Sequence, residues 1–92
     1  MLTIYKYEVP IQDSFMLKLP SACKFLAFQS QRDRPQIWML VDPEDTRTIE
    51  CEFRLVGTGH SIEEPEGNLN YRGTCQIGEG ALVWHLFEVF RF

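Results

Sequence analysis

The stretch Ile37-Trp38-Met39-Leu40-Val41-Asp42-Pro43 is apolar at five consecutive positions and then ends in an Asp-Pro turn signal. Most other apolar residues of the chain fall on every second position, as they do in half-exposed strands. A strand that is apolar on both faces needs cover on both faces. In a small chain the sheet must therefore wrap around itself or dock on a neighbour. The stretch favours a closed or sandwiched β fold.

Length and composition narrow the class of protein. The 92 residues have room for one domain, residues 1–92, with one hydrophobic core. A hydrophobic content of 45% suits an ordered globular protein and argues against disorder. The net charge of -4, with scattered basic residues, argues against general binding to nucleic-acid backbones, because that mode needs clustered Lys and Arg.

Alternating apolar residues and turn signals divide the chain into short strands. The predicted strands cover residues 2–9, 15–19, 23–31, 36–42, 49–55, 69–77 and 81–92. Ile11, Phe15 and Leu19 also fit a helical stripe, but Pro10 and Pro20 leave room for only about two turns, so a strand is preferred. About seven mainly antiparallel strands predict an all-β barrel or sandwich.

Two connections are predicted to be hairpin turns. The polar segment 31–35 joins the third and fourth predicted strands, and its Arg32 to Arg34 tip is the most basic local patch. Gly78-Glu79-Gly80 reverses the chain before the last strand. The two segments that are apolar on both faces, residues 37–41 and 81–92, are expected to be central or intersubunit strands. If residues 37–41 are covered on both faces, replacing Trp38 by Ala should cost roughly 3 to 5 kcal/mol.

The cysteines and the amino-terminal segment indicate the cellular compartment in which the protein is expected. Cys23, Cys51 and Cys75 are widely spaced and odd in number, which predicts buried reduced thiols rather than disulfides or a zinc site. Charges and Pro10 interrupt the amino-terminal segment where a signal peptide needs an apolar run. No segment approaches the roughly 20 apolar residues of a membrane span. We therefore expect a cytoplasmic protein without membrane contact.

Five motifs, spread over nearly the whole chain, support a family resemblance. They are Lys6–Pro10 (KYEVP), Trp38–Pro43 (WMLVDP), Gly57–His60 (GTGH), Tyr71–Gln76 (YRGTCQ) and Gly80–Glu88 (GALVWHLFE). In their order and spacing the chain resembles a family of small proteins of unknown function that are encoded by bacteriophages, prophages and bacterial genomes. The resemblance implies an accessory phage or prophage product.

The histidines and cysteines carry the candidate chemistry. Gly57-Thr58-Gly59-His60 can form either an anion-binding loop, with His60 as donor or proton carrier, or a tight turn that simply needs its glycines. His85 alternates with Val83 and Phe87, so a hydrogen-bonded core or interface role is expected. The spacing supplies no further ligands for a metal site, and Cys51 and Cys75 lie on apolar strand faces, where a reactive thiolate is not expected. No enzyme activity and no cofactor are therefore predicted.

The long connection from Gly57 to Asn68 is the predicted binding loop. Loops on a rigid β scaffold tend to carry recognition, and this one combines glycines, a histidine and acidic residues. Thr58 and His60 are expected to provide hydrogen bonds, and Trp84 or Tyr71 an adjoining apolar wall. The acidic run 63–66 is expected to be a solvated loop, with docking on a basic partner as the alternative. An EF-hand loop that starts at Asp42 is excluded, because Arg47 and Phe53 stand where glycine and glutamate are required.

A non-enzymatic binding protein is the function expected from these patterns. Two Trp, three Tyr and seven Phe exceed what one small core easily hides, which favours self-association or a partner surface. We expect a homo-oligomer that forms through residues 81–92. The implied phage origin suggests a target in the host bacterial cytoplasm, a host protein or small nucleotide of a defence system such as CRISPR or cyclic-nucleotide signalling. The alternative is a structural component of the virion.

Overall fold

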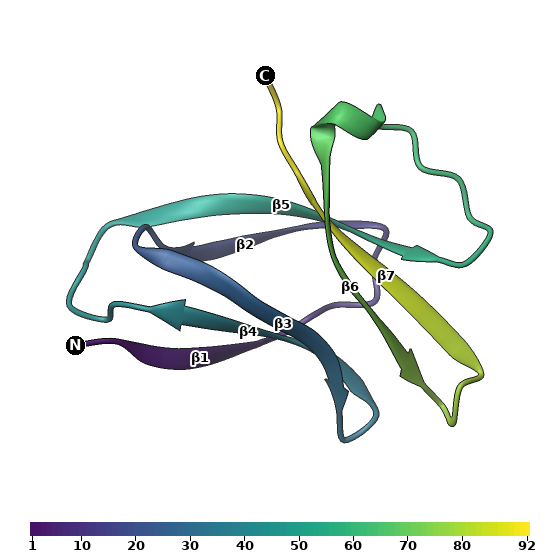
Figure 1. Ribbon diagram of the computed structural model, residues 1–92, viewed down its shortest axis with the longest axis horizontal. Helices are drawn as coiled ribbons and strands as arrows, with labels where there is room; N and C mark the ends of the chain where they lie inside the picture. Colours follow the sequence, from purple (N-terminus) through teal and green to yellow (C-terminus); the bar gives the residue numbers. More distant parts are fainter.

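Seven antiparallel strands in two facing sheets form the protein (Figure 1). The computed structural model describes residues 1–92. The strands are β1 Thr3–Glu8, β2 Ser14–Pro20, β3 Cys23–Gln31, β4 Arg34–Val41, β5 Thr48–Gly57, β6 Leu69–Ile77 and β7 Leu82–Val89, and the 3-10 turn η1 spans Glu66–Asn68. No helix in this structure has the length or the apolar character that crossing a membrane requires. The all-β prediction is confirmed, including a strand rather than a helix at β2.

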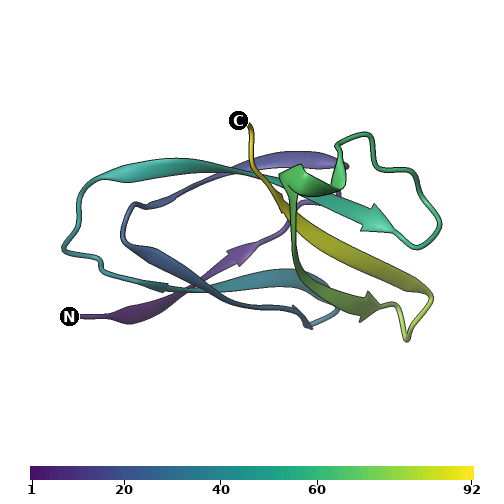
Figure 2. The ribbon, with the colours of Figure 1, turned by 45° about the horizontal axis from the view of Figure 1, so that its top comes forward.

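The strands divide into two sheets. Sheet A has the order β1-β4-β3, and sheet B has the order β2-β5-β7-β6. Figure 2 shows the two layers from a second direction. The sheets do not pair into one closed cylinder, so the architecture is a sandwich rather than a barrel. The two segments that are apolar on both faces supply β4 and β7, each of which has a hydrogen-bonded neighbour on both sides. They are therefore central strands, as the sequence analysis anticipated.

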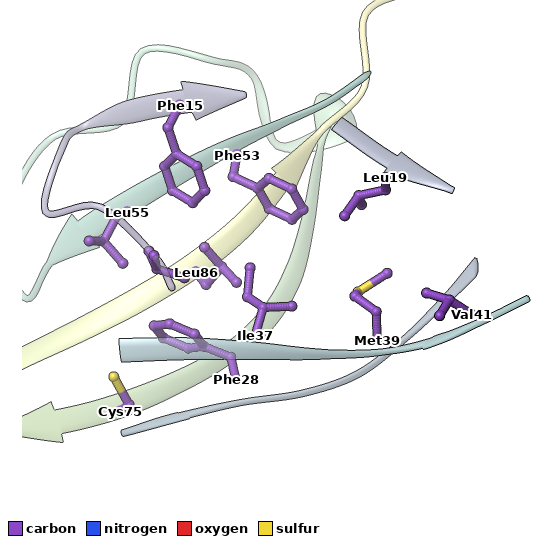
Figure 3. Close-up of a cluster of buried hydrophobic side chains, with 11 residues drawn as sticks. Phe15, Leu19, Phe28, Ile37, Met39, Val41, Phe53, Leu55, Cys75 and Leu86 are labelled. Carbon is purple, nitrogen blue, oxygen red and sulfur yellow. The ribbon is translucent and has the colours of Figure 1, made fainter. Parts of the chain in front are cut away.

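The core fills the space between the sheets (Figure 3). Ile37 and Val41 of β4 and Leu86 of β7 have no exposed surface. Phe15 and Phe53 are direct partners across β2 and β5, and their rings stack with centroids 5.3 Å apart. Successive side chains of a strand point to opposite faces of the sheet, so every second side chain enters the core. The apolar residues that alternate along the sequence therefore build this core.

The outer face of sheet A is not covered by a second layer of the chain, contrary to the expectation for residues 37–41. Trp38 and Leu40 of β4 point away from the core and are only half-buried, because no second layer of the chain covers them. Trp38 is flanked on this face by its register partners Lys6 and Ala27. The expectation that this segment is covered on both faces is therefore wrong within a single chain. Its continuous apolar run reflects a central position, with one face in the core and the other shielded only by neighbouring side chains.

The turn between β3 and β4 links the two sheets. Arg32 and Asp33 have positive φ values of 52° and 62°, the pattern of the tight two-residue turn that matches strand twist. The Asp33 carboxylate accepts a hydrogen bond of 2.7 Å from the backbone N–H of Gly78, in the turn between β6 and β7. The predicted hairpin is confirmed, and its tip is tied to the second predicted turn.

One corner of the sandwich is formed by β3 and β6, which pack against each other without pairing. Each strand carries a register shift there, between Phe25 and Ala27 in β3 and between Tyr71 and Gly73 in β6. Gly73 has a φ of +146°, and a Cβ atom on it would lie 3.3 Å from the Cβ of Phe28. Only glycine combines this backbone conformation with so close an approach.

We predict that Gly73→Ala lowers the free energy of unfolding by roughly 1 to 3 kcal/mol, because alanine strains both the dihedral angle and the contact with Phe28. The matched control is Gly67→Ala, since nothing lies within 4 Å of a Cβ at Gly67 and its φ is not positive. Urea denaturation of both variants measures the difference. Equal effects of the two substitutions would contradict the proposed corner constraint.

We predict that Trp38→Ala lowers the free energy of unfolding by about 1 to 2 kcal/mol. Phe53→Ala should lower it by more, by roughly 3 to 5 kcal/mol. The reason is that Trp38 lies half-buried on the outer face of sheet A, whereas Phe53 is 1% exposed in the core. Chemical denaturation under identical conditions compares them. A Trp38 variant as destabilised as the Phe53 variant would show that a further layer covers this face in solution.

Candidate functional site

The turn that follows β5 has a compact geometry. The backbone N–H of His60 donates a 3.0 Å hydrogen bond to the carbonyl of Gly57, and Gly59 has a φ of +88°. The His60 ring folds back over Gly57 so closely that a Cβ there would lie 3.0 Å from two ring atoms. Both glycines therefore have a conformational role, which is the tight-turn alternative of the sequence analysis. The side chain of His60 makes no hydrogen bond within the chain.

Beside this turn, His85 links side chains from the outer face of sheet B. Its Nε2 lies 2.7 Å from Oγ1 of Thr58, and its Nδ1 lies 2.9 Å from Oγ1 of Thr74. The hydroxyl of Tyr71 hydrogen-bonds in turn to Oγ1 of Thr74. We call this chain of four side chains, Thr58-His85-Thr74-Tyr71, the outer network. The expectation of a hydrogen-bonded His85 holds. Of the two placements left open, core or interface, the core is excluded, because the ring is half-buried on the outer face.

A β-bulge assembles the outer network. Tyr71 is the register partner of Phe87 and Thr74 is the partner of His85, so the extra residue between them is Arg72. Simple alternation places positions 71 and 74 on opposite faces, whereas the bulge brings both to the outer face. The same shift separates Tyr71 from Cys75, which the sequence pattern had placed on one face. Thr74 was missed for this reason, although Gly73, a lone glycine inside a predicted strand, was a signal that could have indicated the bulge.

The chemistry of the outer network follows from its donors and acceptors. A neutral imidazole donates through one nitrogen and accepts through the other, so the two threonine hydroxyls take opposite roles. A protonated His85 donates to both hydroxyls, and neither bond has to break. The Tyr71 ring packs against Phe87 with centroids 5.7 Å apart, while 59% of Tyr71 remains exposed. The network thus presents oriented hydroxyl groups beside an exposed aromatic ring.

A shallow hollow of about 230 Å³ adjoins the outer network. Thr58, His60 and Trp84 all line it, together with Leu82 and Val83. Trp84 reaches the hollow from the inner face of sheet B, where it packs against the core. Three of the four predicted site residues therefore meet here. Tyr71, the fourth, does not line the hollow and joins the site only through Thr74 and His85.

The long loop is anchored to sheet B by ion pairs. Nε of Arg54 donates to both carboxylate oxygens of Glu64, at 2.9 and 3.1 Å. Arg91 contacts Glu64 at 3.2 Å and Glu52 at 2.7 Å. The carboxylate side chain of Glu64 is only 7% exposed, so the expectation of a wholly solvated acidic loop is wrong at this residue. The hydrogen bond from Arg54 holds the pKa of Glu64 below its usual value.

We predict that Glu64→Gln destabilises the protein by about 1 kcal/mol at neutral pH, because the charge-assisted hydrogen bonds to Arg54 are weakened. The lowered pKa means that this contribution is present above the unfolded-state pKa of about 4.3 and is lost as pH falls through the folded-state pKa. The stability difference between wild type and variant should therefore shrink below about pH 4. Urea titrations at neutral and acidic pH measure it. A difference independent of pH would contradict the ionic anchor.

No three His, Cys, Asp or Glu side chains come together in a metal-binding arrangement. What the outer network offers is hydrogen-bonding groups held in place by three neighbouring strands.

Comparison with known proteins places the chain in a family. No curated protein and no solved structure matches it. A family model described as a domain of unknown function, DUF7352, matches residues 1–91. Because this match spans nearly the whole sequence, the chain belongs to the DUF7352 family.

Proposed function

We propose that the protein is a non-enzymatic binding protein and that it recognises its partner through the outer network and the adjoining hollow. The observation that carries this proposal is the hydrogen-bonded chain from Thr58 through His85 and Thr74 to Tyr71. Its members come from the end of β5, from β7 and from β6, so the packing of sheet B holds them in register. Rigid placement of polar groups lowers the entropic cost of binding.

The character of the surface supports binding over catalysis. Thr58 and His85 have the spacing of a nucleophile and a base, but the second ring nitrogen meets the hydroxyl of Thr74 rather than a carboxylate. A hydroxyl gives a developing imidazolium less stabilisation than a carboxylate does. An exposed Tyr, such as Tyr71, is instead typical of recognition surfaces.

A phage-encoded protein that acts on a host component is the biological role we propose. The resemblance to phage and prophage proteins supports this origin, and it makes the host bacterial cytoplasm the proposed compartment. A host protein or a small nucleotide of a defence system, in CRISPR or cyclic-nucleotide signalling, is the proposed target. The exposed aromatic and hydroxyl groups can serve either ligand, because they combine stacking with hydrogen bonding.

Self-association remains part of the proposal in a narrower form. Since β7 already pairs with β5 and β6, residues 82–89 cannot add a strand from a second copy at their edge. The remaining route is face packing by the carboxy-terminal segment, where Phe92 is fully exposed. Such packing would bury apolar surface that the single chain leaves in water.

The proposal predicts that Thr58→Val combined with Tyr71→Phe weakens partner capture about tenfold while the melting temperature stays nearly unchanged. Both changes remove only hydroxyl groups and keep the shape of the side chains, and exposed hydrogen bonds contribute little to folding. The matched control is Thr48→Val, an exposed threonine at the start of β5 outside the outer network. The measurement is quantitative capture of host components from a bacterial lysate and of a cyclic-nucleotide panel.

Three results would contradict the proposal. Undiminished capture by the folded double variant would place the binding surface elsewhere. Incorporation into purified virions would favour the structural alternative. Turnover of a captured nucleotide that depends on His85 would show an enzyme instead.

A further inference from the structure

A second hollow lies inside the sandwich, on the opposite face of sheet B from the outer network. It has a volume of about 380 Å³ and is lined from both sheets, with apolar walls from Leu19, Phe25, Met39 and Phe53. A neighbouring hollow of about 390 Å³ opens where β7 leaves β5, and the two share Ile49, Cys51 and Glu88. We call the first hollow the inner pocket. Its size lies within the range of small-molecule sites.

An ion pair forms the polar part of the inner pocket. Glu88 is the register partner of Phe53, so its carboxylate starts from the inner face of a central strand. Nε and Nη2 of Arg72 donate to Oε1 of Glu88 at 3.1 and 2.7 Å. Their side chains are only 28% and 16% exposed. The Arg72 guanidinium also lies over the Phe25 ring, 5.3 Å from its centroid.

This ion pair keeps unused hydrogen-bonding capacity. Both bonds from Arg72 fall on Oε1 of Glu88, and the other group that interacts with this carboxylate is the Cys51 thiol, a weak donor, so the carboxylate keeps capacity to accept from a ligand. Nη1 of Arg72 donates no hydrogen bond within the chain and is free to donate. Desolvating an ion pair has a cost that folding recovers poorly, and an apolar residue at position 88 would fill the inner face more simply. The pair therefore has the features of a recognition element, because it keeps both a donor and an acceptor for a ligand.

The rest of the inner pocket is uncharged apart from Lys24, which is exposed at its rim. Cys23 and Cys51 line it as free thiols. Burial, with Glu88 nearby, raises the pKa of both, that of Cys51 to about 11, so they stay neutral at pH 7. Neutral thiols behave as small apolar groups. The pocket thus has apolar walls and thiols on one side, and the Arg72–Glu88 pair, Ser21 and Lys24 as its polar groups.

We propose that the inner pocket binds a small planar ring compound with a lactam edge. The lactam N–H donates to Oε2 of Glu88, its carbonyl accepts from Nη1 of Arg72, and the ring packs between the apolar walls and the thiols. An oxo-substituted nucleobase has this chemistry. The inference uses residues of the inner pocket alone and is independent of the function proposed for the outer network.

The test compares hypoxanthine, which has a lactam edge, with purine, which has the same ring system without it. Both are titrated into the full-length protein and followed by amide NMR. We expect saturable shifts at Cys23, Phe25, Cys51 and Glu88 with hypoxanthine, and at least about tenfold weaker binding of purine, because a two-point hydrogen-bonded edge discriminates by that order. Bound hypoxanthine should also slow alkylation of Cys23 and Cys51 but not of Cys75, which lies outside the pocket.

The variant Arg72→Lys keeps the positive charge but removes the planar donor pair, and should weaken hypoxanthine binding about tenfold. Its matched control is Arg34→Lys, whose arginine pairs with Glu8 outside the inner pocket and should leave binding unchanged. Equal binding of hypoxanthine and purine, no hypoxanthine shifts at millimolar concentration, or shifts confined to Thr58, Thr74 and His85 would overturn the inference. The last result would leave the outer network as the only nucleotide site. If the Arg72→Lys variant does not fold, two measurements on the wild-type protein test the proposal: the comparison of hypoxanthine with purine, and the protection of Cys23 and Cys51 from alkylation.

Discussion

The bulge at Arg72 is the constraint on which both candidate sites depend. It lies where β6 approaches β3, and the glycine that follows it, Gly73, allows the two backbones to close one corner of the sandwich. The inserted residue changes the phase of the inward and outward alternation, so that residues after Arg72 point to the opposite face from the one that simple alternation predicts. Tyr71 and Thr74 consequently share the outer face, while the guanidinium of Arg72 reaches the inner pocket. One local irregularity thus positions polar groups on both sides of sheet B.

Strand β7 contributes side chains to both sites, because its residues point alternately to the outer and the inner face of sheet B. His85 points outward to the threonine hydroxyls, and Glu88, three positions later, points inward to Arg72. Between them Leu86 has no exposed surface and locks the strand to the core. Because β7 is hydrogen-bonded on both sides, neither site can shift without breaking a central ladder. This rigidity suits recognition, since the groups are in place before a ligand arrives.

The sequence predicted much of the fold and a part of the site. The continuous apolar runs identified β4 and β7, two of the three central strands, whereas the third, β5, has an alternating pattern. The turn signals located the β3–β4 and β6–β7 reversals. The glycines around Thr58 and His60 correctly marked an irregular loop, and Trp84 was correctly brought beside them. The interpretation was wrong where a side chain's direction depends on register. Simple alternation puts Tyr71 and Cys75 on one face and left Thr74 unnoticed, and it could not decide between a core and an interface position for His85, which the structure places on the outer face.

What the sequence determined by itself was the class of structure, because the hydrophobic period and the turn residues act over a few neighbouring positions. Strand number, the central strands and the hairpins follow from such local rules. The tertiary structure decided which side chains meet. The bulge lies where β3 and β6 pack together, and the residues that approach each other there, Phe28 and Gly73, are 45 positions apart in the sequence. The ion pairs of Glu88 with Arg72 and of Glu64 with Arg54 and Arg91 likewise form only in the folded chain, and no local pattern encodes those partners.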